Sequence, residues 1–203
     1  MRSTFARTAV RFVFALAIPS GALLFTPACS ETTPAVPRVI LDSTIRPGSN
    51  PQAACQISSR EWVQIGKFGG IGTAPRPVDN GSTEGSGQVS VSCGVLAEGD
   101  GFRISASTTL SGGEGGTVTI NGLFSTARQP QPNITVVFNR GDFGRFEQKD
   151  CVATYDVNPN AGVASGRIWA KVTCPKATRE GGRACETEAQ FRFENCEQTL
   201  PQQ

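Results

Sequence analysis

Apolar and polar residues alternate along most of this chain, which is the pattern of β-strands with one buried face. The clearest run is Gln88–Val95, where Val89, Val91, Cys93 and Val95 share one side. The same period recurs in short runs at Arg38–Leu41, Phe102–Ala106, Val118–Ile120, Ile134–Phe138, Cys151–Val157, Ile168–Cys174 and Ala189–Phe193. Turns rich in glycine and asparagine separate these runs. No stretch has a convincing helical period, and Ser58–Ile65 suits a strand as well as a short helix.

The strand pattern predicts an all-β fold. About eight or nine short strands do not bury a common face as one flat sheet, so they fold as a two-sheet sandwich or a squat barrel. We expect the antiparallel β-sandwich, because two inner faces can supply one core. Residues 38–203 have the length of one such domain.

The first 28 residues have a different composition. They carry three arginines and no acid, followed by the apolar runs Phe12–Ile18 and Ala22–Phe25, which Pro19–Gly21 separates. This is the pattern of a signal peptide. Together the two runs fall short of the roughly 20 apolar residues that a membrane-spanning helix needs. We therefore expect residues 1–28 to be removed on export.

The end of this leader, Leu23–Ser30, resembles the lipobox of bacterial lipoproteins, in which a small residue precedes an acylated cysteine. Ala28 and Cys29 match the pattern, whereas Thr26 stands where leucine is usual. The resemblance implies that Cys29 is diacylated, that it becomes the first mature residue, and that Ser30 permits sorting to the outer membrane. Residues 29–37 would then form a lipidated tether to the membrane. Cleavage after Ala28 without lipidation, giving a secreted or periplasmic protein, stays open.

The cysteine count agrees with this interpretation. Seven cysteines are an odd number, and an acylated Cys29 leaves six that can form three disulfides in an oxidising compartment. These six are Cys55, Cys93, Cys151, Cys174, Cys185 and Cys196. If Cys174 and Cys185 face each other across a hairpin, the most local completion pairs Cys55 with Cys93 and Cys151 with Cys196. This is one of fifteen possible connectivities.

The charge balance argues against a nucleic-acid partner. The whole chain has a formal net charge of +2, but three of its 19 lysines and arginines lie in the leader. The remaining residues carry one more acid than base and no cluster of lysine or arginine. The basic surface that nucleic-acid binding requires is therefore missing.

The chain contains no histidine, which removes most catalytic triads, zinc hydrolases and proton relays. Cysteine spacing does not match a zinc site, and the turn acids, such as Asp79 with Glu84, Glu98 with Asp100 and Asp142 with Glu147, do not match a calcium loop. We therefore expect no cofactor, no metal site and no catalytic residue. A glycan hydrolase built on two carboxylates remains the weakest alternative.

Two features are candidates for binding. Trp169 alternates with Ile168, Ala170, Val172 and Cys174, so it should point outward beside Arg167 and Lys171. Such a ring can stack on a sugar or a partner, or its basic neighbours or a loop can cover it. The other feature is the irregular stretch Gly66–Gly87, with Arg76 as a polar handle.

These observations predict a non-enzymatic lipoprotein of the cell envelope, with a structural or macromolecule-binding role. An envelope protein or a glycan could be the partner. The alternative is a carbohydrate-binding module that uses Trp169 and the Gly66–Gly87 stretch.

Overall fold

The computed structural model describes residues 35–49, 52–57, 61–113, 115–179 and 182–198. These residues form an antiparallel sheet of 12 strands and one short helix. The long strands are β1 (Arg38–Arg46), β5 (Gly87–Glu98), β6 (Gly101–Leu110), β7 (Thr117–Ser125), β8 (Gln131–Arg140), β9 (Gly144–Thr154), β11 (Arg167–Arg179) and β12 (Arg183–Glu194). The short elements are α1 (Gln52–Cys55), β2 (Glu61–Ile65), β3 (Val78–Asp79), β4 (Thr83–Glu84) and β10 (Gly162–Ala164). The predicted all-β, antiparallel class is confirmed, and each predicted strand lies within or overlaps an observed one.

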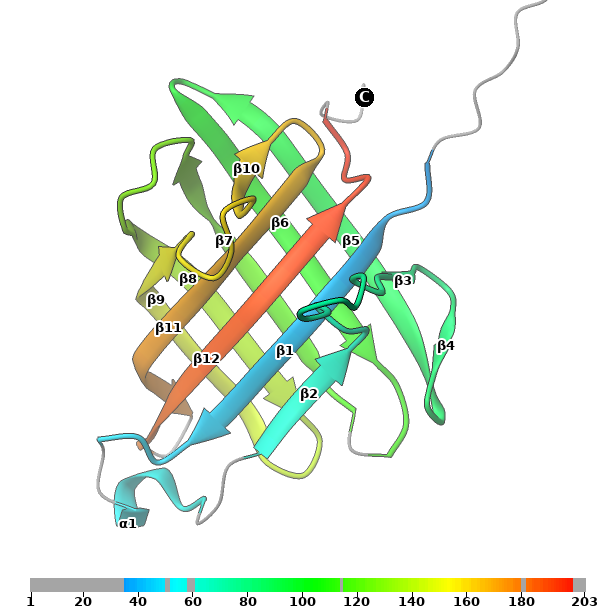
Figure 1. The fold of residues 1–203 in the computed structure, drawn as a ribbon. Helices are drawn as coiled ribbons and strands as arrows, with labels where there is room; N and C mark the ends of the chain where they lie inside the picture. The colour runs from blue at the N-terminus through cyan, green and yellow to red at the C-terminus, as the bar shows by residue number, and fades with distance from the viewer. Residues whose placement is uncertain (1–34, 50–51, 58–60, 114, 180–181, 199–203) are drawn as a thin grey trace, which may run out of the picture. The chain divides into compact units, whose positions relative to one another are not determined.

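The strands form a meander in which most neighbours in sequence are neighbours in space. Strands β5 to β9 pair in order, β9 pairs with β11, β11 with β12, and β12 with β1, so the first and last long strands lie side by side (Figure 1). All these strands belong to one continuous sheet. The expected two-sheet sandwich is therefore replaced by a single curled sheet, because β1 adds to the end of the meander.

Two segments cover the outer edge of β5 and bring the sheet close to a barrel. The Gly81 amide donates to the Val89 carbonyl and the Val89 amide to the Ser82 carbonyl, each at 2.8 Å. Further along, Glu197 pairs with β5 through the Val95 amide at 2.8 Å and the Cys93 carbonyl at 2.9 Å. Because β3 pairs with β1 as well, the segment around residues 78–84 bridges β1 and β5.

Side chains fill the interior of this curled sheet. Inward residues of every long strand join one core, whose largest members are fully buried aromatic side chains. These are Tyr155, Phe124, Phe138, Phe146, Phe191 and Phe193. Alternation along each strand produces this core, since every second residue faces inward. The interior is therefore packed, and any binding surface must lie on the outside.

Three disulfides join the six cysteines, but none of the expected pairs is correct. The bonds are Cys55–Cys185, Cys93–Cys196 and Cys151–Cys174. The first ties α1 to β12, the second ties the segment after β12 to β5, and the third joins β9 to β11.

Strand register explains why the predicted hairpin bridge fails. Cys174 of β11 lies opposite Thr187 of β12, and Cys185 of β12 lies opposite Ala177 of β11, because an irregularity after Cys174 shifts the register. On the other edge of β11, Thr173 lies opposite Val152 of β9, which brings Cys174 next to Cys151. Their Cα atoms are 4.6 Å apart, close to the spacing of directly opposed residues in an antiparallel pair.

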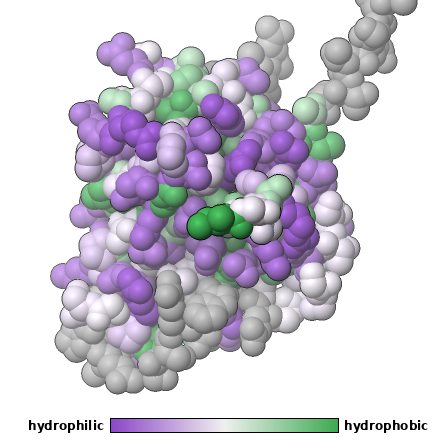
Figure 2. Space-filling view, viewed as in Figure 1, coloured by the Kyte–Doolittle hydropathy of each residue, from purple (hydrophilic) through white to green (hydrophobic). Residues whose placement is uncertain are grey.

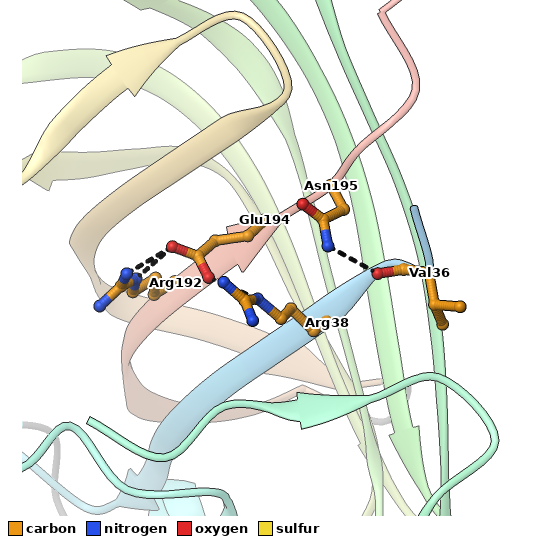
Figure 3. A network of polar contacts seen from close by, with 5 residues as sticks. All are labelled: Val36, Arg38, Arg192, Glu194 and Asn195. Carbon is orange, nitrogen blue, oxygen red and sulfur yellow. Dashed lines mark hydrogen bonds and ion pairs between the residues drawn. The ribbon is translucent and has the colours of Figure 1, made fainter. Parts of the chain in front are cut away.

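Polar contacts fix the start of the domain to the end of β12 (Figure 3). Glu194 accepts hydrogen bonds from Arg38 Nε at 2.7 Å and from Arg192 Nε at 2.8 Å, and Asn195 Nδ2 donates to the Val36 carbonyl at 2.9 Å. The end of the expected tether, residues 36 and 37, is thus bound to the domain. The expected signal peptide and Cys29 lie outside the described residues.

Three disulfides indicate an oxidising, extracytoplasmic environment. Among the described residues, no helix is long and apolar enough to cross a membrane.

The observed disulfide pairing can be checked on unreduced protein. Trypsin cuts after lysine and arginine, which places the six cysteines on different peptides. Mass spectrometry should find three linked pairs that correspond to the bonds above; a Cys174–Cys185 linked pair would contradict this fold. Because Cys93–Cys196 closes a loop of 103 residues, the double variant Cys93→Ala/Cys196→Ala should lose about 2–5 kcal/mol in urea unfolding.

The chain has one tyrosine, Tyr155, and its burial leads us to expect that the folded domain loses stability at alkaline pH. Its side chain is buried and donates to the Ser125 carbonyl at 2.9 Å, and burial raises the pKa of its hydroxyl above the ordinary value. The unfolded chain therefore releases this proton first, above pH about 10, and the free energy of unfolding should fall there by about 1.4 kcal/mol per pH unit.

Absorbance of the phenolate reports this residue alone, and Tyr155→Phe should remove its share of the pH dependence. Phenolate formation near pH 10 in the folded protein would contradict the prediction.

Candidate functional site

The site that best combines the predicted binding residues is a surface groove where β10, β11 and β12 meet. We call it the tryptophan groove; it has a volume of about 470 Å³. Its lining residues are Pro159, Asn160, Gly162, Arg167, Ile168, Trp169, Arg192, Phe193 and Glu194. Both Trp169 and Arg167, which the sequence singled out, therefore lie in one site.

Trp169 faces outward, as the strand alternation predicts, but its ring is half-buried. Phe68 stacks on it with ring centroids 6.0 Å apart and an angle of 18° between the planes. The Arg192 guanidinium also lies over the ring, 5.2 Å from its centroid. A loop residue thus covers the ring, which is one of the alternatives that the sequence left open. The cation over the ring is Arg192 of β12, whereas the sequence suggested Arg167 and Lys171.

One flank of Trp169 stays open because of its neighbour on β10. Gly162 lies opposite Trp169, and a side chain there would meet no atom within 4 Å. The absence of a side chain at Gly162 leaves the space that forms the groove.

The indole nitrogen of Trp169 has no protein partner in the described part of the chain. Its Nε1 atom is buried but makes no hydrogen bond there. A buried donor without an acceptor costs about 1–3 kcal/mol, and such groups need a structural or functional explanation. An acceptor atom of a bound molecule would satisfy it.

Arg167 gives the groove a positive charge that no described acid neutralises. Arg192 and Arg38 share the carboxylate of Glu194, which is almost completely buried (Figure 3). Arg167 is exposed and forms no ion pair with any described residue, although it lies directly opposite Glu194 in the sheet. A ligand with a carboxylate or another anionic group would complement this arginine.

The other two predicted binding residues lie outside the groove. Lys171 is on the same face of β11 but pairs with Glu188 at 3.0 Å. Arg76 makes two hydrogen bonds to Glu84, of which that from Nη1 is 3.1 Å long. Neither side chain contributes to the groove wall.

The Gly66–Gly87 stretch is more ordered than an irregular loop. Lys67 and Arg76 exchange backbone hydrogen bonds of 3.0 and 2.8 Å, and the chain then forms β3 and β4. The hairpin 67–76 crosses the outer face of the sheet near β1 and β12 (Figure 1) and brings Phe68 to Trp169. The stretch therefore covers part of the predicted site and does not itself present a free binding loop.

Arginines pair with four of the six turn acids that were considered as calcium ligands. Glu84 pairs with Arg76, Glu98 with Arg103, Asp142 with Arg140 and Glu147 with Arg145. The hydrogen bond from Arg103 lowers the pKa of Glu98 below its ordinary value. Within the described ranges, no three metal-ligating side chains lie together.

A wider groove of about 830 Å³ runs between β9 and β11, where their pairing is interrupted. Much of its polar wall is internally bonded: Arg145 pairs with Glu147 at 2.7 Å, and the Gln148 amide binds Asp150 at 3.0 Å. The Lys176 backbone amide also donates to Gln148 at 2.8 Å. None of the residues that line this groove has a buried polar side-chain atom without a hydrogen-bond partner, as Trp169 Nε1 is. We therefore place the site at the tryptophan groove.

Phe68, Arg192 and Gly162 also shape the site, and the sequence analysis did not identify them. They come from three separate segments and meet Trp169 only through the hairpin and the strand register. No local motif marks any of them. The outward alternation of Arg192 was visible in the sequence, but its position beside Trp169 was not.

Comparison with known proteins does not assign a function to this groove. No family model, no curated protein and no solved structure matches the chain.

Proposed function

We propose that this chain is a non-enzymatic binding module of the cell envelope, anchored by a lipid on Cys29, that holds an acidic segment of an envelope protein in the tryptophan groove. The observation that carries the proposal is the buried Nε1 of Trp169, which has no hydrogen-bond partner among the described residues. The same groove contains Arg167, which forms no ion pair with any of them. The packed interior supports a role for the outer surface.

The groove offers complementary contacts for such a segment. Arg167 supplies an exposed guanidinium that can bind a carboxylate through two hydrogen bonds. Trp169 supplies an aromatic edge for apolar contact, and its buried indole nitrogen gains an acceptor if a partner oxygen displaces a covering side chain. Tryptophan and arginine are also the residue types that most often dominate binding energy in protein interfaces.

Carbohydrate binding through Trp169 has less support from this geometry. A sugar that stacks on Trp169 needs an open face of its ring, but Phe68 and Arg192 both lie against this ring. The hairpin 67–76 would have to move before a sugar could take the place of Phe68. A glycan partner therefore needs a different surface.

Anchoring fits the position of the groove. The tether joins the domain at Val36 and Arg38, and Arg38 shares Glu194 with Arg192 of the groove (Figure 3). In a lipid-anchored protein, the groove would thus lie at the end of the domain from which the tether leaves. The proposed partner would be a protein close to the membrane surface.

Photo-crosslinking in the native host tests this proposal. A photoreactive residue in place of Asn160, an exposed residue of the groove lining, reports on groove neighbours and leaves Arg167 in place. The same residue in place of Thr178, at the far end of β11, is the matched control. We expect a discrete adduct from position 160 that is absent from position 178 and at least about tenfold weaker when Trp169→Ala is added.

Peptide sequencing of the adduct should place an acidic segment at the crosslink. No adduct at position 160, equal adducts at both positions, or a crosslinked segment without acids would each overturn the proposal. The same cells show whether Cys29 is acylated, through intact mass measurement of the extracted protein.

A further inference from the structure

The outer face of β5 to β8 carries no charged side chain over an array of twelve positions. We call this array the hydroxyl face. Its residues are Ser90, Ser92 and Gly94 on β5, Ser105, Ser107 and Thr109 on β6, Thr117, Thr119 and Asn121 on β7, and Thr135, Val137 and Asn139 on β8. All of them are exposed or half-buried. Ten of the twelve carry a hydroxyl or an amide.

The other half of the sheet has the opposite character. Over β1, β11 and β12 the outward side chains form ion pairs, such as Arg46–Glu186, Arg38–Glu194 and Lys171–Glu188. Figure 2 shows that hydrophilic residues dominate this half of the surface. The hydroxyl face is therefore a distinct region and does not represent the average surface of the protein.

Strand register arranges the hydroxyl face in rows. Ser90, Thr109, Thr117 and Asn139 lie side by side across four strands, and Ser92, Ser107, Thr119 and Val137 form the next row. Hydrogen bonds of 3.1 Å between Ser107 and Thr119 and of 2.9 Å between Thr109 and Thr117 orient the central hydroxyls. The face thus repeats similar groups about every 4.8 Å across the strands and about every 6.8 Å along them.

A charge-free array favours an uncharged partner. Binding a neutral molecule here desolvates hydroxyls and amides, which can exchange hydrogen bonds with the hydroxyls of a sugar, and buries no ion. The repetition in two directions suits a polymer of repeating units, because many weak contacts then add along the chain.

The size of the face argues against a second copy of this protein as the partner. The array spans roughly 14 by 14 Å, or about 200 Å², on the strand spacings above. A stable protein interface buries about 800 Å² on each partner, and it has apolar anchors at its centre. Val137 is the only large apolar side chain among the twelve positions.

We propose that the hydroxyl face binds a neutral polysaccharide. This binding goes beyond the proposed groove function and is independent of it, since the groove lies on β10 to β12 and the hydroxyl face on β5 to β8. The protein would then hold a protein segment on one side and an uncharged glycan on the other.

Polysaccharide binding by the purified full-length protein tests the inference. The probes are insoluble cellulose and chitin in sedimentation assays and soluble dextran in native affinity gels, with polygalacturonate as an anionic comparison. We expect retention by at least one neutral polymer and equal retention at low and high salt, because no ion pair contributes.

Two matched variants locate the surface. Ser92→Lys/Ser105→Lys places two charges on the hydroxyl face, and Thr173→Lys/Thr178→Lys adds the same charge on outward positions of β11. We expect the first variant to lose affinity by at least about tenfold and the second to bind like the unmodified protein. Trp169→Ala should also leave this binding unchanged, and Thr119→Val, which removes one hydroxyl, should weaken it by about threefold.

Thermal unfolding of each variant shows whether it is folded. If the charged variant does not fold, Thr119→Val still tests the inference. The inference is overturned if no neutral polymer binds. It is equally overturned if retention is restricted to polygalacturonate and lost in salt, or if the β11 variant loses as much affinity as the hydroxyl-face variant. Failure of the groove crosslink alone would leave these results unaffected.

Discussion

The pairing of β1 with β12 is the constraint on which the rest of this structure depends. It adds the first long strand to the last one over nine residue pairs, from Arg38 opposite Glu194 to Arg46 opposite Glu186. Once β1 is in place, β3 can pair with it, and the residues after β12 can reach the edge of β5. The Cys93–Cys196 bond then makes this closure covalent. A curled sheet results, because every strand edge that closure brings together gains hydrogen bonds that an open edge would lack.

Closure also decides where function can reside. The inward side chains meet in one core of aromatic and aliphatic residues, so the space inside the sheet is occupied. What remains for binding is the outer surface, and its two halves differ in charge. Ion pairs cover the half formed by β1, β11 and β12, whereas the hydroxyl face on β5 to β8 carries mainly serine, threonine and asparagine. The ion pair Glu98–Arg103 on β5 and β6 lies outside that face.

The tryptophan groove is a consequence of the same pairing. Arg192 lies beside Trp169 because β12 is in register with β11, and Glu194 holds Arg192 in place together with Arg38 of β1. Phe68 arrives from the hairpin that follows β2, the strand on the far side of β1. A small change in register would therefore dismantle the groove while leaving every strand intact, since side chains alternate between the two faces.

The sequence by itself determined the long strands, their inward and outward faces, the formation of disulfides and the outward direction of Trp169, because these follow from a local period of two and from cysteine chemistry. The short strands β3, β4 and β10 were not predicted, because they are too short to show that period. It did not determine that β1 joins β12, that cysteines 23, 103 and 130 residues apart are partners, or that Phe68 covers Trp169. The sequence also did not determine the rows of the hydroxyl face, since alternation shows that Ser107 and Thr119 point outward but not that they form a hydrogen bond. Each of these depends on which strands become neighbours and in what register. That choice minimises the free energy of the whole sheet, and no short window of sequence contains it.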